Sequence, residues 1–186
     1  MEKQRKVFSK IYDQYIDKIY RFIFFKVSSE EIAEDLTSET FLKTWEVYKN
    51  QKLNPENQKE IENPQAFLYR IARNLVTDHY RERAKNQIIS AENASIIDPR
   101  ENLEERAMLS SDLERVMKVM ADLKEDYQNV IIWRYVDGLP IEEVAYLLDR
   151  TEQNTRVLLH RSLEALREKL SFPKEKLNSE KGKKLS

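Results

Sequence analysis

The chain has 186 residues and a formal net charge of −1, with 35% charged and 40% hydrophobic residues. That length has room for one or two small domains. The chain contains only 2 glycines and 5 prolines, which argues against an all-β fold and favours long helices. The absence of cysteine excludes a disulfide framework, a thiol nucleophile and a cysteine zinc site. The near-zero net charge does not by itself indicate a nucleic-acid partner.

The N-terminal segment lacks the apolar core of a signal peptide. The longest uninterrupted apolar runs, such as residues 22–25 and 130–133, are far too short to cross a bilayer. We therefore expect a cytoplasmic protein with no membrane insertion.

An acidic helix is predicted near the N-terminus. Apolar residues recur at intervals of three and four over residues 8–23, which predicts a first helix, and Ser29 is suited to cap a second one. In that second helix, residues 30–46 carry six acidic side chains against one basic residue, Lys43, giving a local net charge of −5. Such a run is either an ordinary solvated helix face or a docking surface for a basic partner.

The charge reverses after a polar loop at residues 51–64. Residues 66–85 predict an amphipathic helix with a net charge of +3, in which arginines alternate with Tyr69, His79 and Tyr80. Guanidinium groups neutralise phosphates and aromatic rings stack on exposed bases, so this helix suits nucleic-acid binding. The alternative is an amphipathic helix whose arginines pair with its own acidic residues.

A second break at residues 86–100 has little helical period. We predict an all-α fold of two small helical domains, and we assign the break to a flexible linker between them. Polar, lysine-rich residues follow Pro173 and are predicted to be disordered. The predicted division is a first domain at 1–85, a linker at 86–102, a second domain at 103–171 and a disordered basic tail at 172–186.

Residues 137–170 predict two helices joined by a tight turn. Ile141, Val144, Ala145 and Leu148 form one apolar stripe, the pattern breaks at residues 149–151, and a longer helix with a polar outward face follows. This layout is typical of a DNA-reading helix-turn-helix. Taken alone, the segment fits an ordinary helical hairpin equally well.

The order of these segments resembles the extracytoplasmic-function (ECF) group of the sigma-70 family of bacterial sigma factors. YDQYIDKIYRFIFFKV resembles the opening helix of the family's first domain, and AEDLTSETFLKTW resembles its polymerase-docking helix. FLYRIARNLVTDHYRER resembles the helix that acts at the promoter −10 element, and residues 123–170 resemble the domain that reads the −35 element. The resemblance covers most of residues 8–170. It implies a sigma factor that directs promoter-specific initiation.

The resemblance implies that the partners are promoter DNA and the clamp and flap regions of RNA polymerase core. The resemblance also allows an anti-sigma factor as a further partner. The acidic helix is then the clamp-binding element. Its implied core-polymerase-binding residues are Glu34, Asp35, Leu36, Glu39, Thr40, Phe41 and Trp45.

The basic helix is then the element that binds and separates the strands at −10, which requires a site for flipped bases and a cationic track. The preceding loop is longer and more polar than is usual in the family, so no base-pocket residue is assigned to it. The implied −10 DNA-binding residues are Tyr69, Arg70, Arg73, Asn74, His79, Arg81 and Arg83.

The second helix of the helix-turn-helix is then the −35 recognition helix. This chain departs from the usual family pattern there: Pro140 replaces a serine cap, Asp149 replaces a turn glycine, and Leu158 and Leu163 replace arginines. Asp149 can adopt the left-handed conformation that the turn requires. The implied −35 DNA-binding residues are Thr151, Gln153, Asn154, Arg156, His160 and Arg161, with Thr151 as the N-cap.

Other classes explain less of the chain. A one-component helix-turn-helix regulator that acts without core polymerase is the main alternative, but it leaves the acidic and basic helices unexplained. A helical adaptor or an RNA-binding protein is a more remote one. An enzyme is disfavoured, because His79 and His160 lie in different predicted domains and there is no glycine-rich phosphate loop. We expect no catalytic residue, no metal and no cofactor.

Overall fold

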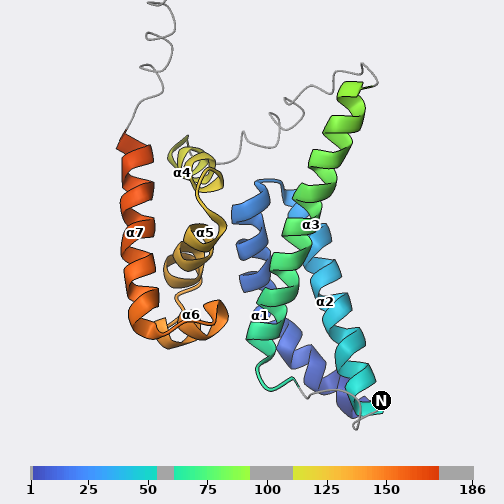
Figure 1. The fold of residues 1–186 in the computed structure, drawn as a ribbon. Coiled ribbons are helices and arrows are strands. Elements are labelled where there is room, and N and C mark those ends of the chain that lie inside the picture. Colours follow the sequence, from blue (N-terminus) through green and yellow to red (C-terminus); the bar gives the residue numbers. More distant parts are fainter. Residues whose placement is uncertain (1, 54–60, 93–110, 172–186) are drawn as a thin grey trace, which may run out of the picture.

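The computed structural model describes residues 2–53, 61–92 and 111–171, and every regular element in these ranges is a helix (Figure 1). The predicted all-α fold of two small helical domains is confirmed. The first domain consists of α1 (Glu2–Val27), α2 (Glu30–Leu53) and α3 (Pro64–Glu92). The second consists of α4 (Ser111–Ala121), α5 (Glu125–Ile131), the π-helix η2 (Ile132–Val136), α6 (Ile141–Leu148) and α7 (Glu152–Ser171).

Some sequence predictions fall outside these ranges or differ at their edges. The expected tail at 172–186 and residues 93–102 of the expected linker lie outside the described residues. Residues 86–92 of that linker are helical, because α3 continues to Glu92. The helix that begins at Glu125 changes character at Ile132, where the backbone adopts the wider π form. Such π segments are rare and are often found at functional sites.

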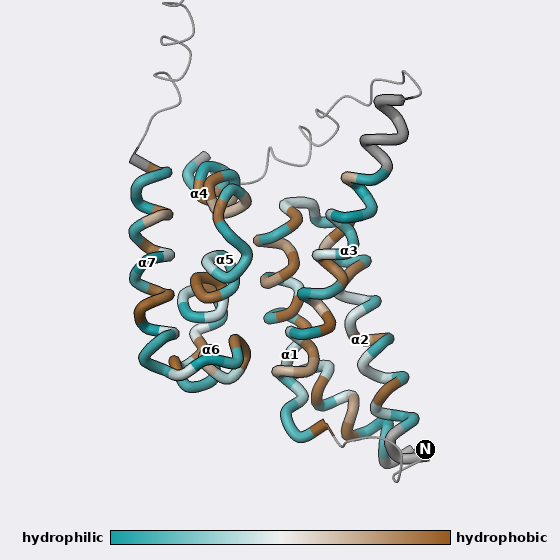
Figure 2. Tube along the Cα trace, viewed as in Figure 1, coloured by the Kyte–Doolittle hydropathy of each residue, from teal (hydrophilic) through white to brown (hydrophobic). Residues whose placement is uncertain are grey.

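The three helices of the first domain pack around a shared apolar core. Phe8 contacts Trp45 at a ring-centroid distance of 5.1 Å, and Tyr12 contacts Phe41 at 4.8 Å, so aromatic pairs join α1 to α2. Figure 2 shows hydrophobic and hydrophilic residues alternating along the helices, as expected where each helix buries one face. The buried apolar residues of this domain are Ile19, Phe22, Ile23, Ala33, Leu36, Phe41, Leu68, Tyr69, Ala72, Leu75 and Val76.

In the second domain α7 packs against α4, α5 and α6. The buried face of α7 includes two hydroxyl residues, Thr155 and Ser162. Each donates a hydrogen bond to a backbone carbonyl one turn earlier, at 3.0 Å from Thr155 to Thr151 and 2.7 Å from Ser162 to Leu158. Burial of these hydroxyls therefore leaves no donor unsatisfied.

The predicted turn chemistry is confirmed at Ser29 and Asp149, and a glycine in the left-handed conformation follows η2. Ser29 Oγ accepts a hydrogen bond from the backbone N–H of Ile32, and Gly138 has φ +68° after η2. Asp149 adopts the left-handed conformation, with φ 52° and ψ 49°. The N–H groups of Asp149 and Arg150 return to the carbonyls of the last turn of α6 at 3.2 and 3.0 Å, forming a Schellman motif.

The two domains pack directly on one another. Figure 1 shows α5 lying between α7 and α1, and α6 lying near α3. α1 contacts α4 and η2, while α3 contacts α6, so one continuous apolar cluster runs through both domains. Among the described residues, no helix combines the length and apolar character needed to cross a bilayer.

Candidate nucleic-acid and protein interfaces

The acidic helix α2 divides its seven predicted docking residues between core and surface. Leu36, Thr40 and Phe41 are buried in the first domain, and the Thr40 hydroxyl donates to the Leu36 carbonyl at 2.7 Å. These three residues hold α2 in place and are not available to a rigidly docked partner. The others reach the surface: Glu34 and Asp35 are exposed, and Glu39 and Trp45 are partly buried.

The exposed face of α2 also presents an apolar residue that sequence reasoning missed. The Leu42 side chain is 57% exposed, one helical turn after Ser38 and two after Asp35. The sequence could have shown this, because helical spacing places Leu42 on the same face as Asp35 and Ser38 and turns it away from the buried Phe41. The exposed face of α2 therefore combines an apolar side chain with carboxylates.

The basic helix α3 exposes four of its seven predicted DNA-binding residues, Arg70, Asn74, Arg81 and Arg83. The Arg70 guanidinium lies over the Phe67 ring, 5.0 Å from its centroid, which restricts the side chain without removing its charge. Arg81 forms an ion pair with Asp78 on the same helix at 3.0 Å. This part of α3 is a cationic surface open to solvent.

His79 is partly buried beside this surface, and its ring contacts Tyr80 edge-on at 5.5 Å. Burial lowers the pKa of His79, and the nearby Arg83 lowers it further. The imidazole is therefore neutral near pH 7. It offers a stacking ring and a hydrogen bond but not a cation for phosphate.

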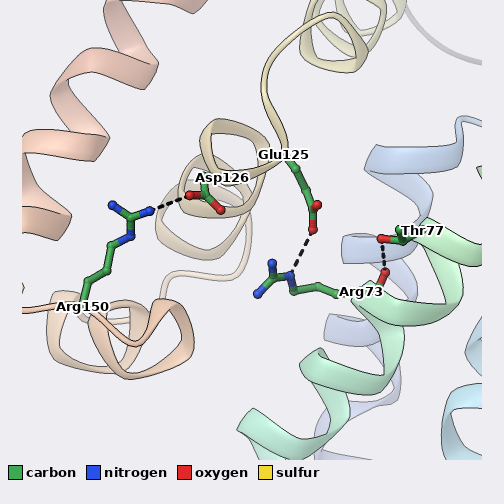
Figure 3. A network of polar contacts seen from close by, with 5 residues as sticks. All are labelled: Arg73, Thr77, Glu125, Asp126 and Arg150. Atoms are coloured by element: carbon green, nitrogen blue, oxygen red, sulfur yellow. Dashed lines mark hydrogen bonds and ion pairs between the residues drawn. The ribbon is translucent and has the colours of Figure 1, made fainter.

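The other two predicted α3 residues face the second domain. The Tyr69 side chain is fully buried, and its hydroxyl donates to Asp137 Oδ2 at 2.7 Å. Arg73 Nε pairs with Glu125 Oε1 of α5 at 3.2 Å (Figure 3). The structure therefore separates the seven residues into four exposed ones, the partly buried His79, and a pair that contacts α5 and η2.

Charged groups are buried along the same contact. Asp137 lies against Tyr69 and Arg21, the latter at 3.4 Å, and its side chain is 0% exposed. Burial raises the pKa of Asp137, although the Tyr69 hydrogen bond and the Arg21 charge oppose the shift. Burial also lowers the pKa of Lys26 to about 8, with the Glu125 carboxylate opposing it. The Lys26 ammonium lies 5.2 Å from the centroid of the Phe22 ring.

The six predicted −35 residues, in the first part of α7 and at the position just before it, are all exposed. The Thr151 hydroxyl oxygen accepts a hydrogen bond from the Asn154 backbone N–H at 3.2 Å, which confirms Thr151 as the N-cap. Arg156 pairs with Glu152 at 3.1 Å and His160 lies 3.4 Å from Glu164, so both side chains are aligned along the helix. The exposed set comprises Thr151, Gln153, Asn154, Arg156, His160 and Arg161.

Packing explains the departures from the family pattern on α7. Leu158 and Leu163 are partly buried and pack against the apolar core, where an arginine would lose its hydration. Arg150, in the turn before α7, forms an ion pair with Asp126 of α5 at 2.8 Å (Figure 3). This pair fixes the turn of the helix-turn-helix on the domain that carries it.

None of the described residues forms a group of three or more histidine, aspartate or glutamate side chains arranged to hold a metal ion. The described part of the chain presents three charged or polar faces: a carboxylate face on α2 and cationic or polar faces on α3 and α7.

Comparison with known proteins identifies the family to which the chain is similar. Residues 11–86 match the model of sigma-70 region 2, and residues 113–166 match the model of sigma-70 region 4. The ECF RNA polymerase sigma factor SigW of Bacillus subtilis is 30% identical over 172 residues, which cover 88% of each chain. The ECF RNA polymerase sigma factor BldN of Streptomyces coelicolor is 28% identical over 165 residues, covering 86% of this chain and 58% of BldN.

The fold is also found in solved structures. The sigma factor RpoE of Bartonella quintana, in its co-crystal structure with the anti-sigma factor NepR, matches with a TM-score of 0.61 at 21% identity. That match covers 91% of this chain and 99% of RpoE. With both region models matched in order and a relative at 30% identity over nearly its whole length, the chain belongs to the ECF group of the sigma-70 family of RNA polymerase sigma factors.

Proposed function

We propose that this sigma factor divides its work among three helices: α2 docks on RNA polymerase core, α3 binds and opens the −10 element, and α7 reads the −35 element. The observation that carries the proposal is the exposure of all six −35 residues on a capped recognition helix. Base edges in the major groove are met by side chains at the start of such a helix.

The charges of the three helices match these partners. The carboxylate face of α2 repels DNA and suits a basic protein surface, whereas Arg70, Arg81 and Arg83 on α3 suit the phosphates of a separated strand. The protein itself carries out no chemistry in this scheme, since the polymerase does. The clamp and flap of the polymerase are the proposed docking regions, and the cytoplasm is the proposed site of action.

We further propose an anti-sigma factor as a regulatory partner. The support is that RpoE, which has a similar fold, is bound to NepR in its structure. A protein of this type would compete with core polymerase for the free sigma factor. The proposal predicts that the purified partner, added before core, reduces binding of this chain to core.

Run-off transcription tests the main proposal. The chain is added to core polymerase from the source bacterium with a library of promoter fragments, and core alone is the control. The expected result is initiation that depends on both core and promoter sequence. Tight sequence-specific DNA binding without core, combined with no effect on initiation, would instead identify a one-component regulator.

A further inference from the structure

One exposed side chain of α7 is apolar and stands among the predicted base-reading residues. Val157 is 47% exposed, and among the described residues of α7 it is the only large hydrophobic side chain that is exposed. Five other apolar residues of the helix are partly buried and pack against the core: Leu158, Leu159, Leu163, Ala165 and Leu166. Packing within the domain therefore does not account for a valine at position 157.

Val157 lies at the centre of the outward face of α7. Thr155, on the buried side, is two residues away and hence about 160° around the helix. Residues three and four positions apart are neighbours on a helix, with Cβ atoms about 5–6 Å apart. Four of the six predicted −35 residues stand at these spacings from Val157 and are exposed: Gln153, Asn154, His160 and Arg161. Val157 is thus surrounded by polar side chains that the proposed function assigns to DNA.

A valine contributes little to the stability of an exposed helix. Its branched Cβ gives it a lower helix propensity than alanine, arginine or lysine. The same branching leaves one strongly preferred χ1 rotamer in a helix. The two methyl groups of Val157 are therefore held in a nearly fixed position on the outward face, where they can meet a ligand with little loss of side-chain entropy.

The matching group in DNA is the C5 methyl group of thymine. It projects into the major groove and distinguishes thymine there from the other bases, and apolar side chains contact it. The neighbouring side chains favour A·T pairs as well, because the amides of Gln153 and Asn154 can each form two hydrogen bonds with the N6 and N7 atoms of adenine. In each such pair the thymine methyl group lies in the same groove as those adenine atoms.

From these observations we infer that Val157 is a specificity-determining residue of the −35 helix: its methyl groups contact the C5 methyl group of a thymine in the −35 element. The inference deepens the proposed function of α7 and rests on it. The contact removes about one methyl group from water, which corresponds to about fourfold in affinity. It also discriminates against cytosine, whose amino group would face a side chain that cannot accept a hydrogen bond.

Replacement of thymidine by deoxyuridine removes the methyl group and nothing else. Uracil pairs with adenine as thymine does, so the replacement tests the methyl contact at one base at a time. The full chain is assembled with core polymerase, and the promoter library of the run-off assay first provides the preferred −35 element. Each thymine of that element, on either strand, is then replaced in turn, and initiation is measured at holoenzyme concentrations too low to saturate the promoter.

The test variant is Val157→Ala. The matched control is Val7→Ala, the same substitution at a valine of α1 that is 41% exposed. With the parent and the control, deoxyuridine at one position should lower initiation about fourfold. Val157→Ala should initiate about fourfold less than the parent on the thymine promoter, and deoxyuridine at that position should cause no further loss. Circular dichroism should show equal helicity in the three proteins, since alanine favours a helix more than valine does.

Three results would overturn the inference. The first is that deoxyuridine has no effect at any −35 position with the parent, and the second is that the effect is undiminished with Val157→Ala. The third is a loss of helicity in that variant, which would give Val157 a structural role. Failure of the proposed function is distinguishable, because the parent would then initiate without regard to the −35 sequence or without core.

Discussion

The indole of Trp133 lies nearly parallel to the phenyl ring of Phe22, with ring centroids 5.7 Å apart, although 111 residues of sequence separate the two positions. Phe22 belongs to α1 of the first domain and Trp133 to the π-helix of the second. This pair is one of the contacts that join the first domain to the second.

A double-mutant cycle tests that pair. Trp133→Leu and Phe22→Leu are each expected to lower the free energy of unfolding by about 2–3 kcal/mol, because each removes part of a fully buried ring. The double variant should lose about 0.5–1.5 kcal/mol less than the two single losses together. Urea denaturation followed by circular dichroism measures all four proteins. Strict additivity would mean that the rings do not interact in solution.

Burial of Lys26 predicts a pH-dependent stability. Its pKa is lowered to about 8 in the folded protein from the 10.5 of an exposed lysine. Between these pH values the unfolded state binds more protons, so the folded state gains stability as pH rises from about 8 to about 10.5. The charged lysine is correspondingly costly at pH 7.

Lys26→Met removes that cost and keeps the length of the side chain. We expect the variant to be more stable than the parent by on the order of 2 kcal/mol at pH 7, with the difference disappearing near pH 10.5. Chemical denaturation over this pH range provides the measurement. Lys118→Met, at an exposed position in the second domain, is the matched control and should show no such trend. If the difference in free energy of unfolding between Lys26→Met and the parent stayed constant with pH, burial of the charge would be contradicted.

We expect the exposed Leu42 side chain to contact polymerase without contributing to the stability of the fold. Leu42→Ala should leave the free energy of unfolding within about 0.5 kcal/mol of the parent, because the side chain is mostly exposed. Its affinity for core polymerase should fall by about tenfold, as expected for an apolar group at the centre of an interface. Val157→Ala, an exposed apolar residue on α7, is the control and should bind core like the parent. If the two variants bound core polymerase with equal affinity, Leu42 would not be part of the docking face.

The N-cap of α7 makes a separate prediction about stability. Thr151→Ala deletes the oxygen that accepts from the Asn154 N–H and should cost about 1 kcal/mol, lowering Tm by roughly 2–4 °C. Thr151→Ser keeps the acceptor and should restore most of the loss. Differential scanning calorimetry compares the three proteins. If alanine and serine gave the same Tm, the hydroxyl would not be capping the helix.

The division of labour between α3 and α7 is tested in transcription. Arg70→Ala removes an exposed cation of α3 and should lower the yield of open complexes several-fold, measured by permanganate reactivity of unpaired thymines. Arg161→Ala should reduce initiation about tenfold on promoters with an intact −35 element and much less on promoters that lack it. If both variants caused the same uniform loss on every promoter, the two helices would not have the separate roles proposed here.

Much of the local structure was predictable because it depends on residues close together in the sequence. The αL conformation of Asp149, the cap by Thr151 and the exposed face of α7 all follow from helix periodicity and turn chemistry over a few residues. The docking residues of the acidic helix were implied by the family resemblance and not by periodicity. Leu36 and Phe41 are among them and are buried, whereas the neighbouring Leu42 is exposed.

The sequence by itself determined the helices, their caps, the charges of their faces and the family to which the chain belongs. Only the tertiary structure decided the position of Tyr69 and Arg73. Both lie on a polar stretch of α3 that is typical of a solvent-facing surface, yet Asp137 and Glu125 of the second domain cover them. The physical reason is that burial here comes from a second domain far along the chain, and no local pattern of hydrophobicity encodes which surface that domain will cover.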